Sequence, residues 1–305
     1  MVEGMGSTEG GALPTPLLLD EAALMRVLEA LRIARGLDFR QYRTTTIRRR
    51  LERRMAVVRA SDVEEYLRLL FSHPAEYDDL IDYLTLKVSA FFRDARTFDL
   101  LGQVVVPELI VHASQEGRGV LSWSAGCATG EEVYSLAMLF LGHGDEVGVP
   151  VTPLVIGTDI DERALIAART GTYSVARLQD VTREILERWF EPTGSTEDVW
   201  RLCQRVQAVA SFQPHDLVAE CEAPPTDLGG RLFDLVVCRN VLIYMQRPLQ
   251  LAVLARLDRC LIPGGYMVLG EAESLPESFK SAYDAIDRRA RIFRKRAPND
   301  VARFS

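Results

Sequence analysis

A glycine turn between an apolar run and an amphipathic segment constrains the fold of this chain more than any other feature. The apolar run at 120–123 stops at small residues up to Gly126, and apolar residues recur at helical spacing over 133–140. A strand that ends in such a turn and leads into a helix brings bare backbone close to a ligand. Asp159 ends the next apolar run, where an acid can accept hydrogen bonds from ribose hydroxyls. The pattern predicts a nucleoside-containing cofactor.

The spacing within this turn narrows the choice of cofactor. Gly126 and Gly130 enclose Cys-Ala-Thr, which matches neither the dinucleotide-binding pattern nor the P-loop. Glu131 and Glu132 open the following helix, and carboxylates at a helix N-terminus disfavour a phosphate ligand there. A ligand with a ribose, a free amine and a positive sulfur fits better, which indicates S-adenosylmethionine. The turn alone is equally compatible with an ordinary strand–helix connection whose glycines allow tight packing.

Hydrophobic periodicity changes along the chain. Apolar residues recur at helical spacing before about residue 95, for example at Leu24, Leu28 and Leu31, whereas strand-like runs become regular only after residue 119. Alternating strands and helices favour an α/β fold with a parallel-rich sheet covered on both faces. We therefore predict a disordered tail (1–19), an N-terminal helical domain (20–95) and a cofactor domain (96–305) with a small antiparallel β-insertion at about 172–212. The expected strands are 120–123, 154–157, 206–212, 235–238, 266–269 and 291–293.

Composition sets further limits on the function of this 305-residue chain. It is 48% hydrophobic with a net charge of −7, as expected of a globular protein with a sizeable core. No apolar run approaches the ~20 residues that span a bilayer, so we expect no membrane insertion. The cysteines form no C-x-x-C pair and the histidines are scattered, which predicts no metal site. These features, and the lack of a signal-peptide pattern, predict a cytoplasmic protein.

Five blocks of sequence occur in a recognisable order: 89–94 (SAFFRD), 123–135 (WSAGCATGEEVYS), 157–161 (GTDID), 233–244 (FDLVVCRNVLIY) and 263–266 (PGGY). Together they resemble the CheR family of chemotaxis receptor methyltransferases. The resemblance implies a Rossmann-like methyltransferase domain that binds S-adenosylmethionine and releases S-adenosylhomocysteine. It also implies methyl esterification of glutamate side chains on chemoreceptors, typically by a monomer. Amino-group DNA methyltransferases would show an Asp/Asn-Pro-Pro-aromatic block where this chain has 239–244 (RNVLIY).

Arg93 and Tyr244 are the predicted catalytic residues. Arg93 could hold the incoming carboxylate through a bidentate pair. It could equally bind the cofactor's own carboxylate, pair with Glu132, or form an inter-domain salt bridge. The resemblance places the methyl group near Tyr244, although that side chain could simply cap the start of a helix. The predicted cofactor-binding residues are Lys87, Ser89, Arg93, Ala125, Gly126, Glu132, Asp159, Asp216, Leu217, Arg239 and Asn240.

Lys87 departs from the family pattern. The family usually has Asn at this position and Thr at the position of Ser89. An inward-pointing lysine would repel the positive sulfur, whereas a lysine whose stem reaches solvent costs little. An alternative function therefore stays open, namely a receptor-docking module that binds S-adenosylmethionine with weak or no turnover.

The segment 40–59 is strongly basic, with eight arginines and one acid. Its apolar positions form one helical stripe, and Arg50, Arg53 and Arg54 fall mostly off that stripe. The charge could be a solvated face paired to nearby acids, a nucleic-acid contact or a dock for an acidic protein. Nucleic acid is disfavoured because the segment lacks interleaved aromatic residues and the chain is acidic. With the resemblance, we predict that chemoreceptor helical bundles dock on Arg49, Arg50, Arg53 and Arg54.

Overall fold

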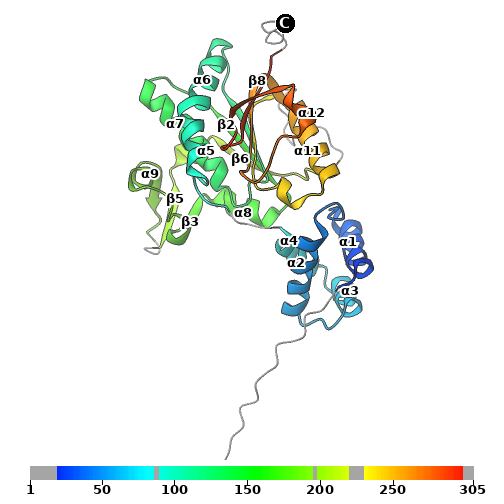
Figure 1. The fold of residues 1–305 in the computed structure, drawn as a ribbon. Coiled ribbons are helices and arrows are strands. Elements are labelled where there is room, and N and C mark those ends of the chain that lie inside the picture. Colours follow the sequence, from blue (N-terminus) through cyan, green and yellow to red (C-terminus); the bar gives the residue numbers. More distant parts are fainter. Residues whose placement is uncertain (1–18, 86–88, 195–197, 220–229, 298–305) are drawn as a thin grey trace, which may run out of the picture. The chain divides into compact units, whose positions relative to one another are not determined.

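The computed structural model describes residues 19–85, 89–194, 198–219 and 230–297. They divide into two compact units, which are described separately (Figure 1). The helical unit contains the described residues up to Arg40 together with Thr44–Leu84, and the sheet unit contains Gln41–Arg43 and those from Thr85 onward. The tail predicted over 1–19 lies outside the described residues except for Leu19, which is buried.

The helical unit consists of amphipathic helices with clear end signals. Asp20 caps the first helix, since its carboxylate accepts a hydrogen bond from the Ala23 N–H at 2.7 Å, and Gly36 ends it with a φ of +76°. Leu24 and Leu28 are buried, as their spacing predicts. The predicted all-helical domain is confirmed. Its helices are α1 (Glu21–Arg35), α2 (Thr44–Val57), α3 (Val63–Ser72) and α4 (Ala75–Leu84).

The described residues of the sheet unit form a seven-stranded sheet in the order β6-β2-β1-β7-β8-β10-β9. Neighbours from β6 to β8 pair in parallel, and β10 runs antiparallel to both β8 and β9. The predicted parallel-rich sheet is therefore confirmed, whereas β9 was not predicted. The strands are β1 (Leu121–Ala125), β2 (Leu154–Asp159), β6 (Ala210–Pro214), β7 (Phe233–Cys238), β8 (Leu261–Leu269), β9 (Tyr283–Asp287) and β10 (Ile292–Lys295).

Helices cover both faces of this sheet (Figure 1). Alternate residues of β7 enter different cores: Val237 packs in the same cluster as Phe140 of α7, and Val236 in the same cluster as Leu257 of α11. This alternation explains why the strand is apolar throughout. The helices are α5 (Ala95–Leu100), η1 (Leu101–Val105), α6 (Val106–Gln115), α7 (Glu131–Val147), α8 (Glu162–Thr170), η3 (Leu242–Tyr244), α11 (Arg247–Arg259) and α12 (Glu277–Lys280).

A second, three-stranded antiparallel sheet lies between α8 and β6 in the sequence, and its strand order is β3-β5-β4. The expected antiparallel β-subdomain is thus present, but its last strand ends at Leu202. The strand expected at 206–212 is wrong in its start, because 204–207 forms a short helix and β6 joins the main sheet. The elements here are β3 (Thr172–Ser174), η2 (Val175–Arg177), α9 (Arg183–Trp189), β4 (Phe190–Pro192), β5 (Val199–Leu202) and α10 (Gln204–Gln207).

Candidate active site

The carboxyl ends of four parallel strands bring most of the predicted site residues to one edge of the sheet. β6, β2, β1 and β7 are neighbours in that order, so their C-terminal ends meet there. Ligands of open α/β sheets bind in the crevice outside such ends. The predicted residues that end or follow these strands are Ala125, Gly126, Glu132, Asp159, Asp216, Leu217, Arg239, Asn240 and Tyr244.

The turn after β1 packs too closely against its neighbours to carry a side chain at Gly126. This glycine has a φ of +81°, and a Cβ on it would lie 2.4 Å from Val241 Cγ2. The N–H groups of Gly126 and Cys127 donate hydrogen bonds to the Thr158 carbonyl at 2.8 and 2.9 Å. The turn is therefore fixed against β2 on one side and against the segment after β7 on the other.

Asp159 closes β2 and connects two turns at the same edge. One carboxylate oxygen accepts a hydrogen bond from the Ala128 N–H at 2.8 Å, and the other accepts one from the Asp161 N–H at 2.9 Å. Burial raises the pKa of the Asp159 carboxyl, and these backbone hydrogen bonds act against that increase. Because a carboxylate oxygen has two lone pairs, each can accept a further hydrogen bond from a ligand hydroxyl.

A buried arginine connects the end of β7 to two other parts of the edge. Arg239 Nη1 donates to Glu132 at 3.1 Å, and Nη2 donates to the Arg93 carbonyl at 2.9 Å and to the Asp94 carboxylate. Glu132 also accepts a hydrogen bond from Ser124 Oγ at 2.8 Å. The Arg239 side chain is 2% exposed, and these contacts position Glu132 and Arg93. The predicted contact of Arg239 with the cofactor stays a prediction.

Arg93 lies in a strained turn that is anchored by aromatic packing. The flanking residues Phe92 and Asp94 both have positive φ, at 51° and 62°, which is costly for side chains of this kind. Phe91 is buried and packs edge-on against Tyr173 of β3, with ring centroids 4.8 Å apart. Strain held by a surrounding structure in this way is typical of functional sites.

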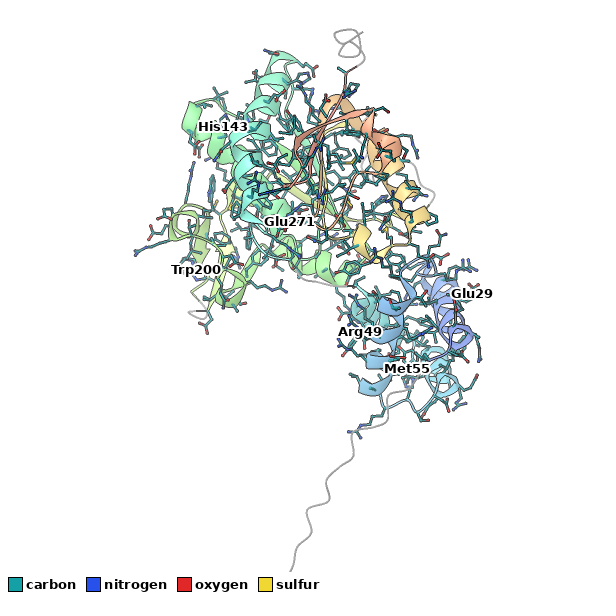
Figure 2. The ribbon with its side chains drawn as sticks, viewed as in Figure 1. Glu29, Arg49, Met55, His143, Trp200 and Glu271 are labelled. Atoms are coloured by element: carbon teal, nitrogen blue, oxygen red, sulfur yellow. The ribbon has the colours of Figure 1, made fainter. Side chains whose placement is uncertain are left out.

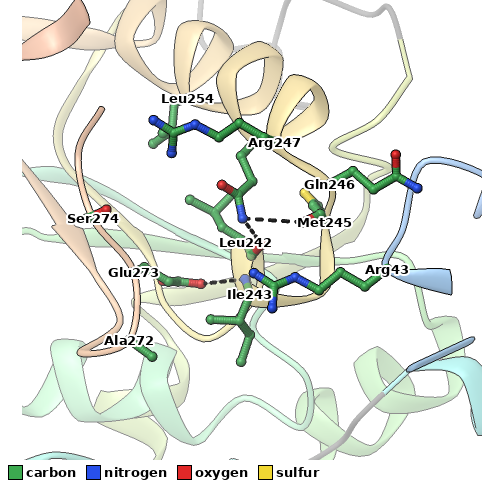
Figure 3. A pocket seen from close by; sticks show the side chains of 11 residues that line it. Arg43, Leu242, Ile243, Met245, Gln246, Arg247, Leu254, Ala272, Glu273 and Ser274 are labelled. Carbon is green, nitrogen blue, oxygen red and sulfur yellow. Dashed lines mark hydrogen bonds between the residues drawn. The ribbon is translucent and has the colours of Figure 1, made fainter. Parts of the chain in front are cut away.

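Tyr244 belongs to a segment, Asn240–Gln246, that we call the Tyr244 loop. The Arg43 N–H donates to the Tyr244 carbonyl at 2.8 Å, and Tyr42 forms an antiparallel bridge with Met245. The loop borders a cavity of about 370 Å³ (Figure 3). Its lining residues include two exposed arginines, Arg43 and Arg247, and the buried carboxylate of Glu273.

Glu273 was not among the predicted site residues. Its Oε2 accepts hydrogen bonds from the N–H groups of Gly270 and Asn240 at 2.6 and 3.2 Å. Its Oε1 accepts one from the Ile243 N–H at 3.2 Å, which Figure 3 shows. It therefore connects the segment after β8 to the Tyr244 loop. Nothing in the single sequence distinguishes it from Glu271, which is exposed two residues earlier.

Two family models match this chain. The all-alpha domain of CheR methyltransferases matches residues 22–85, and the SAM-binding domain of CheR methyltransferases matches residues 87–292. The chain belongs to the CheR methyltransferase family. This confirms the resemblance in the five sequence blocks and assigns the sheet unit as a domain that binds S-adenosylmethionine.

Relatives in the CheR family extend the match over most of the chain. It is 32% identical to the chemotaxis protein methyltransferase of Escherichia coli, covering 85% of this chain and 86% of that one. It is 31% identical to the chemotaxis protein methyltransferase of Klebsiella aerogenes, with 88% of each chain covered. An uncharacterized 104.1 kDa protein of Rhodobacter capsulatus is 32% identical over 90% of this chain, which spans 28% of that protein's length.

The residues at the sheet edge fit the cofactor of the CheR family. Asp159 offers carboxylate oxygens to ribose hydroxyls, and Glu132 offers an acid of opposite charge to an amine. Gly126 leaves no room for a side chain of its own. Among the described residues, no group of three or more histidines, cysteines and acids is placed to hold a metal ion.

The other predicted cofactor residues have mixed outcomes. Lys87 lies outside the described residues, and Ser89 is half-buried. Asp216 accepts a hydrogen bond from the Val218 N–H at 2.8 Å, which fixes the turn after β6. The Leu217 carbonyl accepts one from Arg256 at 2.7 Å. Both half-buried residues stay predictions as adenine contacts.

The basic segment proves to be helix α2, but its arginines differ in exposure. Arg50 and Arg54 are 7% and 9% exposed, so the expectation that they face solvent or a partner is wrong. Arg50 donates to the Leu84 carbonyl and Arg54 pairs with Glu76 at 2.5 Å, both within the helical unit. The Leu84 carbonyl holds the Arg50 side chain inward, and the Glu76 carboxylate of α4 holds that of Arg54.

Arg49 and Arg53 lie on the exposed part of α2 (Figure 2 labels Arg49). Within the described part of the chain, neither side chain forms an ion pair. These two arginines are therefore available to a partner, whereas Arg50 and Arg54 are not. Across the described ranges, no helix has both the length and the apolar character needed to traverse a bilayer.

Proposed function

We propose that this protein transfers a methyl group from S-adenosylmethionine to glutamate side chains of chemoreceptors, forming methyl esters for sensory adaptation. The observation that carries the proposal is the sheet edge itself, where Asp159, Glu132 and Gly126 adjoin the segments that hold Arg93 and Tyr244. Membership of the CheR family, with relatives named chemotaxis protein methyltransferases, supports the same substrate class.

The proposed reaction needs orientation more than acid–base catalysis. A glutamate carboxylate has a pKa near ~4.3 and is already ionised at neutral pH. Its oxygen attacks the methyl carbon, the carbon–sulfur electron pair stays on sulfur, and the products are a methyl ester and S-adenosylhomocysteine. Aligning two reactants can contribute as much as ~7–11 kcal/mol. The residues therefore have to bind, desolvate and align the carboxylate.

The proposed catalytic residues are Arg93 and Tyr244. Arg93 would bind the substrate carboxylate, because a guanidinium matches a carboxylate in a bidentate pair. The strained turn around Arg93 and its anchoring by Arg239 support such a fixed position. Tyr244 would line the reacting groups from the segment after β7, and its loop is contacted by Glu273.

Basic surfaces support an acidic substrate. Arg43 and Arg247 line the cavity beside the Tyr244 loop, and Arg49 and Arg53 are exposed on α2. A glutamate-rich helical bundle would be attracted to such groups. We therefore propose the cytoplasmic helical bundles of chemoreceptors as partners and expect the protein to act in the cytoplasm as a monomer.

Two measurements test this function. Titration calorimetry should show binding of S-adenosylmethionine and S-adenosylhomocysteine, and labelled methyl should pass to receptor-containing membranes. A glutamate methyl ester is released by mild base, so base-stable label would contradict carboxyl methylation. Cofactor binding without transfer to any of a panel of receptors would favour a docking module, which the family relatives do not favour.

A further inference from the structure

The Tyr244 loop carries two of the predicted site residues, Asn240 and Tyr244, and its Leu242 and Met245 side chains are buried in the core. Ile243 and Tyr244 are only half-buried, and the loop borders the cavity of about 370 Å³ on one side. Asn240, at its start, has a φ of +59°, in the left-handed region that asparagine adopts more readily than most other non-glycine residues. Core packing therefore holds the loop at Leu242 and Met245, whereas its backbone at Asn240 and Ile243 depends on other contacts.

Glu273 provides contacts to the loop backbone at Asn240 and Ile243. Its carboxylate is 4% exposed and accepts backbone hydrogen bonds at both oxygens, from Asn240, Ile243 and Gly270. Within the described residues it forms no ion pair with a cation. Burial raises the pKa of the Glu273 carboxyl, and the backbone N–H groups around it act against that increase by stabilising the ionised form.

Gly270 fits this arrangement from the other side. A Cβ on Gly270 would lie 2.7 Å from the Asn240 nitrogen and 2.9 Å from Glu273 Oε2. The glycine therefore allows the two backbone segments to approach closely enough to share one carboxylate oxygen. A side chain there would push the Tyr244 loop away from Glu273.

We propose that Glu273 is a positioning residue for methyl transfer, which sets the Tyr244 loop so that Asn240 meets the cofactor and Tyr244 meets the reacting groups. This inference rests on the proposed function. Glutamine at this position would offer one oxygen, and its amide NH₂ would face a backbone N–H donor. Aspartate would keep both oxygens but withdraw them by one methylene.

Asp234 provides a matched control at the opposite end of β7. It is also a buried carboxylate, and it accepts a hydrogen bond from the Leu121 N–H at 2.8 Å while pairing with Arg118 at 2.7 Å. Both Asp234→Asn and Glu273→Gln should therefore lower the thermal stability. Asp234, however, lies away from the carboxyl edge of the sheet. A loss of activity in Glu273→Gln that Asp234→Asn does not show is then due to the contacts of Glu273 with the Tyr244 loop and not to the loss of a buried carboxylate in general.

The test uses the full chain and three measurements: amide hydrogen exchange, kcat for receptor methylation, and calorimetry with S-adenosylhomocysteine. Amide hydrogen exchange by NMR should speed up about tenfold or more at Asn240 and Ile243 in Glu273→Gln and in Gly270→Ala, because the acceptor is lost or displaced. At saturating cofactor, kcat for receptor methylation should fall about a hundredfold in Glu273→Gln, the scale expected for a misplaced catalytic group. Glu273→Asp should be intermediate, and Asp234→Asn should keep kcat within about twofold per folded molecule.

Two results would overturn the positioning role. One is protection of the loop amides that is unchanged in Glu273→Gln. The other is a kcat equal to that of the wild type although these amides exchange faster. If the wild-type protein methylates no receptor, the proposed function fails separately. The inference is then decided by calorimetry with S-adenosylhomocysteine, where Glu273→Gln should bind about tenfold more weakly and equal affinity would refute it.

Discussion

Arginines have opposite roles at the sheet edge and on helix α2. Arg239 is 2% exposed, and its guanidinium holds the carboxylates of Asp94 and Glu132 in place through ion pairs. Arg49 and Arg53 are exposed and, in the part of the chain that the structure describes, form no ion pair. A paired, buried guanidinium determines geometry, whereas an unpaired, exposed one is available to a partner. Replacing each kind should therefore change different measurements.

The largest effect is expected for Arg239→Gln. The change leaves Asp94 and Glu132 without their cation in a largely buried site, which should lower the free energy of unfolding by about 3–5 kcal/mol. Cofactor affinity should fall as well, because Glu132 loses its orientation. Chemical denaturation and calorimetry measure the two effects. A variant with wild-type stability would show that the three charges are not coupled.

The second effect concerns a buried arginine of α2 itself. Arg54 pairs with Glu76 at 2.5 Å and Asp79 at 2.8 Å, and Tyr66 donates to the same Glu76 carboxylate at 2.8 Å. Arg54→Met should destabilise the helical unit by about 3 kcal/mol, because it leaves Glu76 buried without a cation. Arg53→Met is the matched control one residue away and should change stability by less than about 0.5 kcal/mol. Equal losses in the two variants would contradict the division of α2 into buried and exposed arginines.

The contrast between Arg53 and Arg54 also shows what the sequence can predict. Local signals were sufficient for the turn at Gly126 and for Asp159, because a glycine turn and an acid one strand later are set by neighbours in the chain. The periodicity of α2 could not reveal that α4 supplies Glu76 to Arg54. Such a contact depends on tertiary packing, as does the hydrogen bond that Glu273 accepts from the N–H of Asn240, 33 residues earlier in the chain.

A smaller effect, on the rate of receptor methylation, is expected when the charges of the two exposed arginines are reversed. Arg49→Glu together with Arg53→Glu should reduce kcat/KM for a receptor about tenfold to a hundredfold at low salt, because both charges would repel an acidic helix. Stability and cofactor affinity should stay unchanged, since neither side chain is paired within the described residues. The loss should shrink as ionic strength rises. Initial rates at two salt concentrations test this, and unchanged rates at both would exclude docking on this face.

The smallest expected effect, on the free energy of unfolding, comes from two exposed ion pairs of one aspartate. They show how little an arginine contributes when its ion pair is exposed to solvent. Asp145 of α7 pairs with Arg205 at 2.5 Å and Arg188 at 2.8 Å, and these arginines lower the pKa of its carboxyl from 3.8 to about 2. A lowered folded-state pKa contributes stability above the ordinary pKa, and that contribution is lost as the pH falls toward about 2.

Because all three side chains are at least a third exposed, solvent screening limits the contribution to about 0.5–1 kcal/mol. Asp145→Asn should therefore lower the free energy of unfolding by that amount at pH 7, and the difference from wild type should narrow as the pH falls below about 4. Denaturation of both proteins across this pH range measures the difference, and a constant gap would show that the Asp145 ion pairs are not its source.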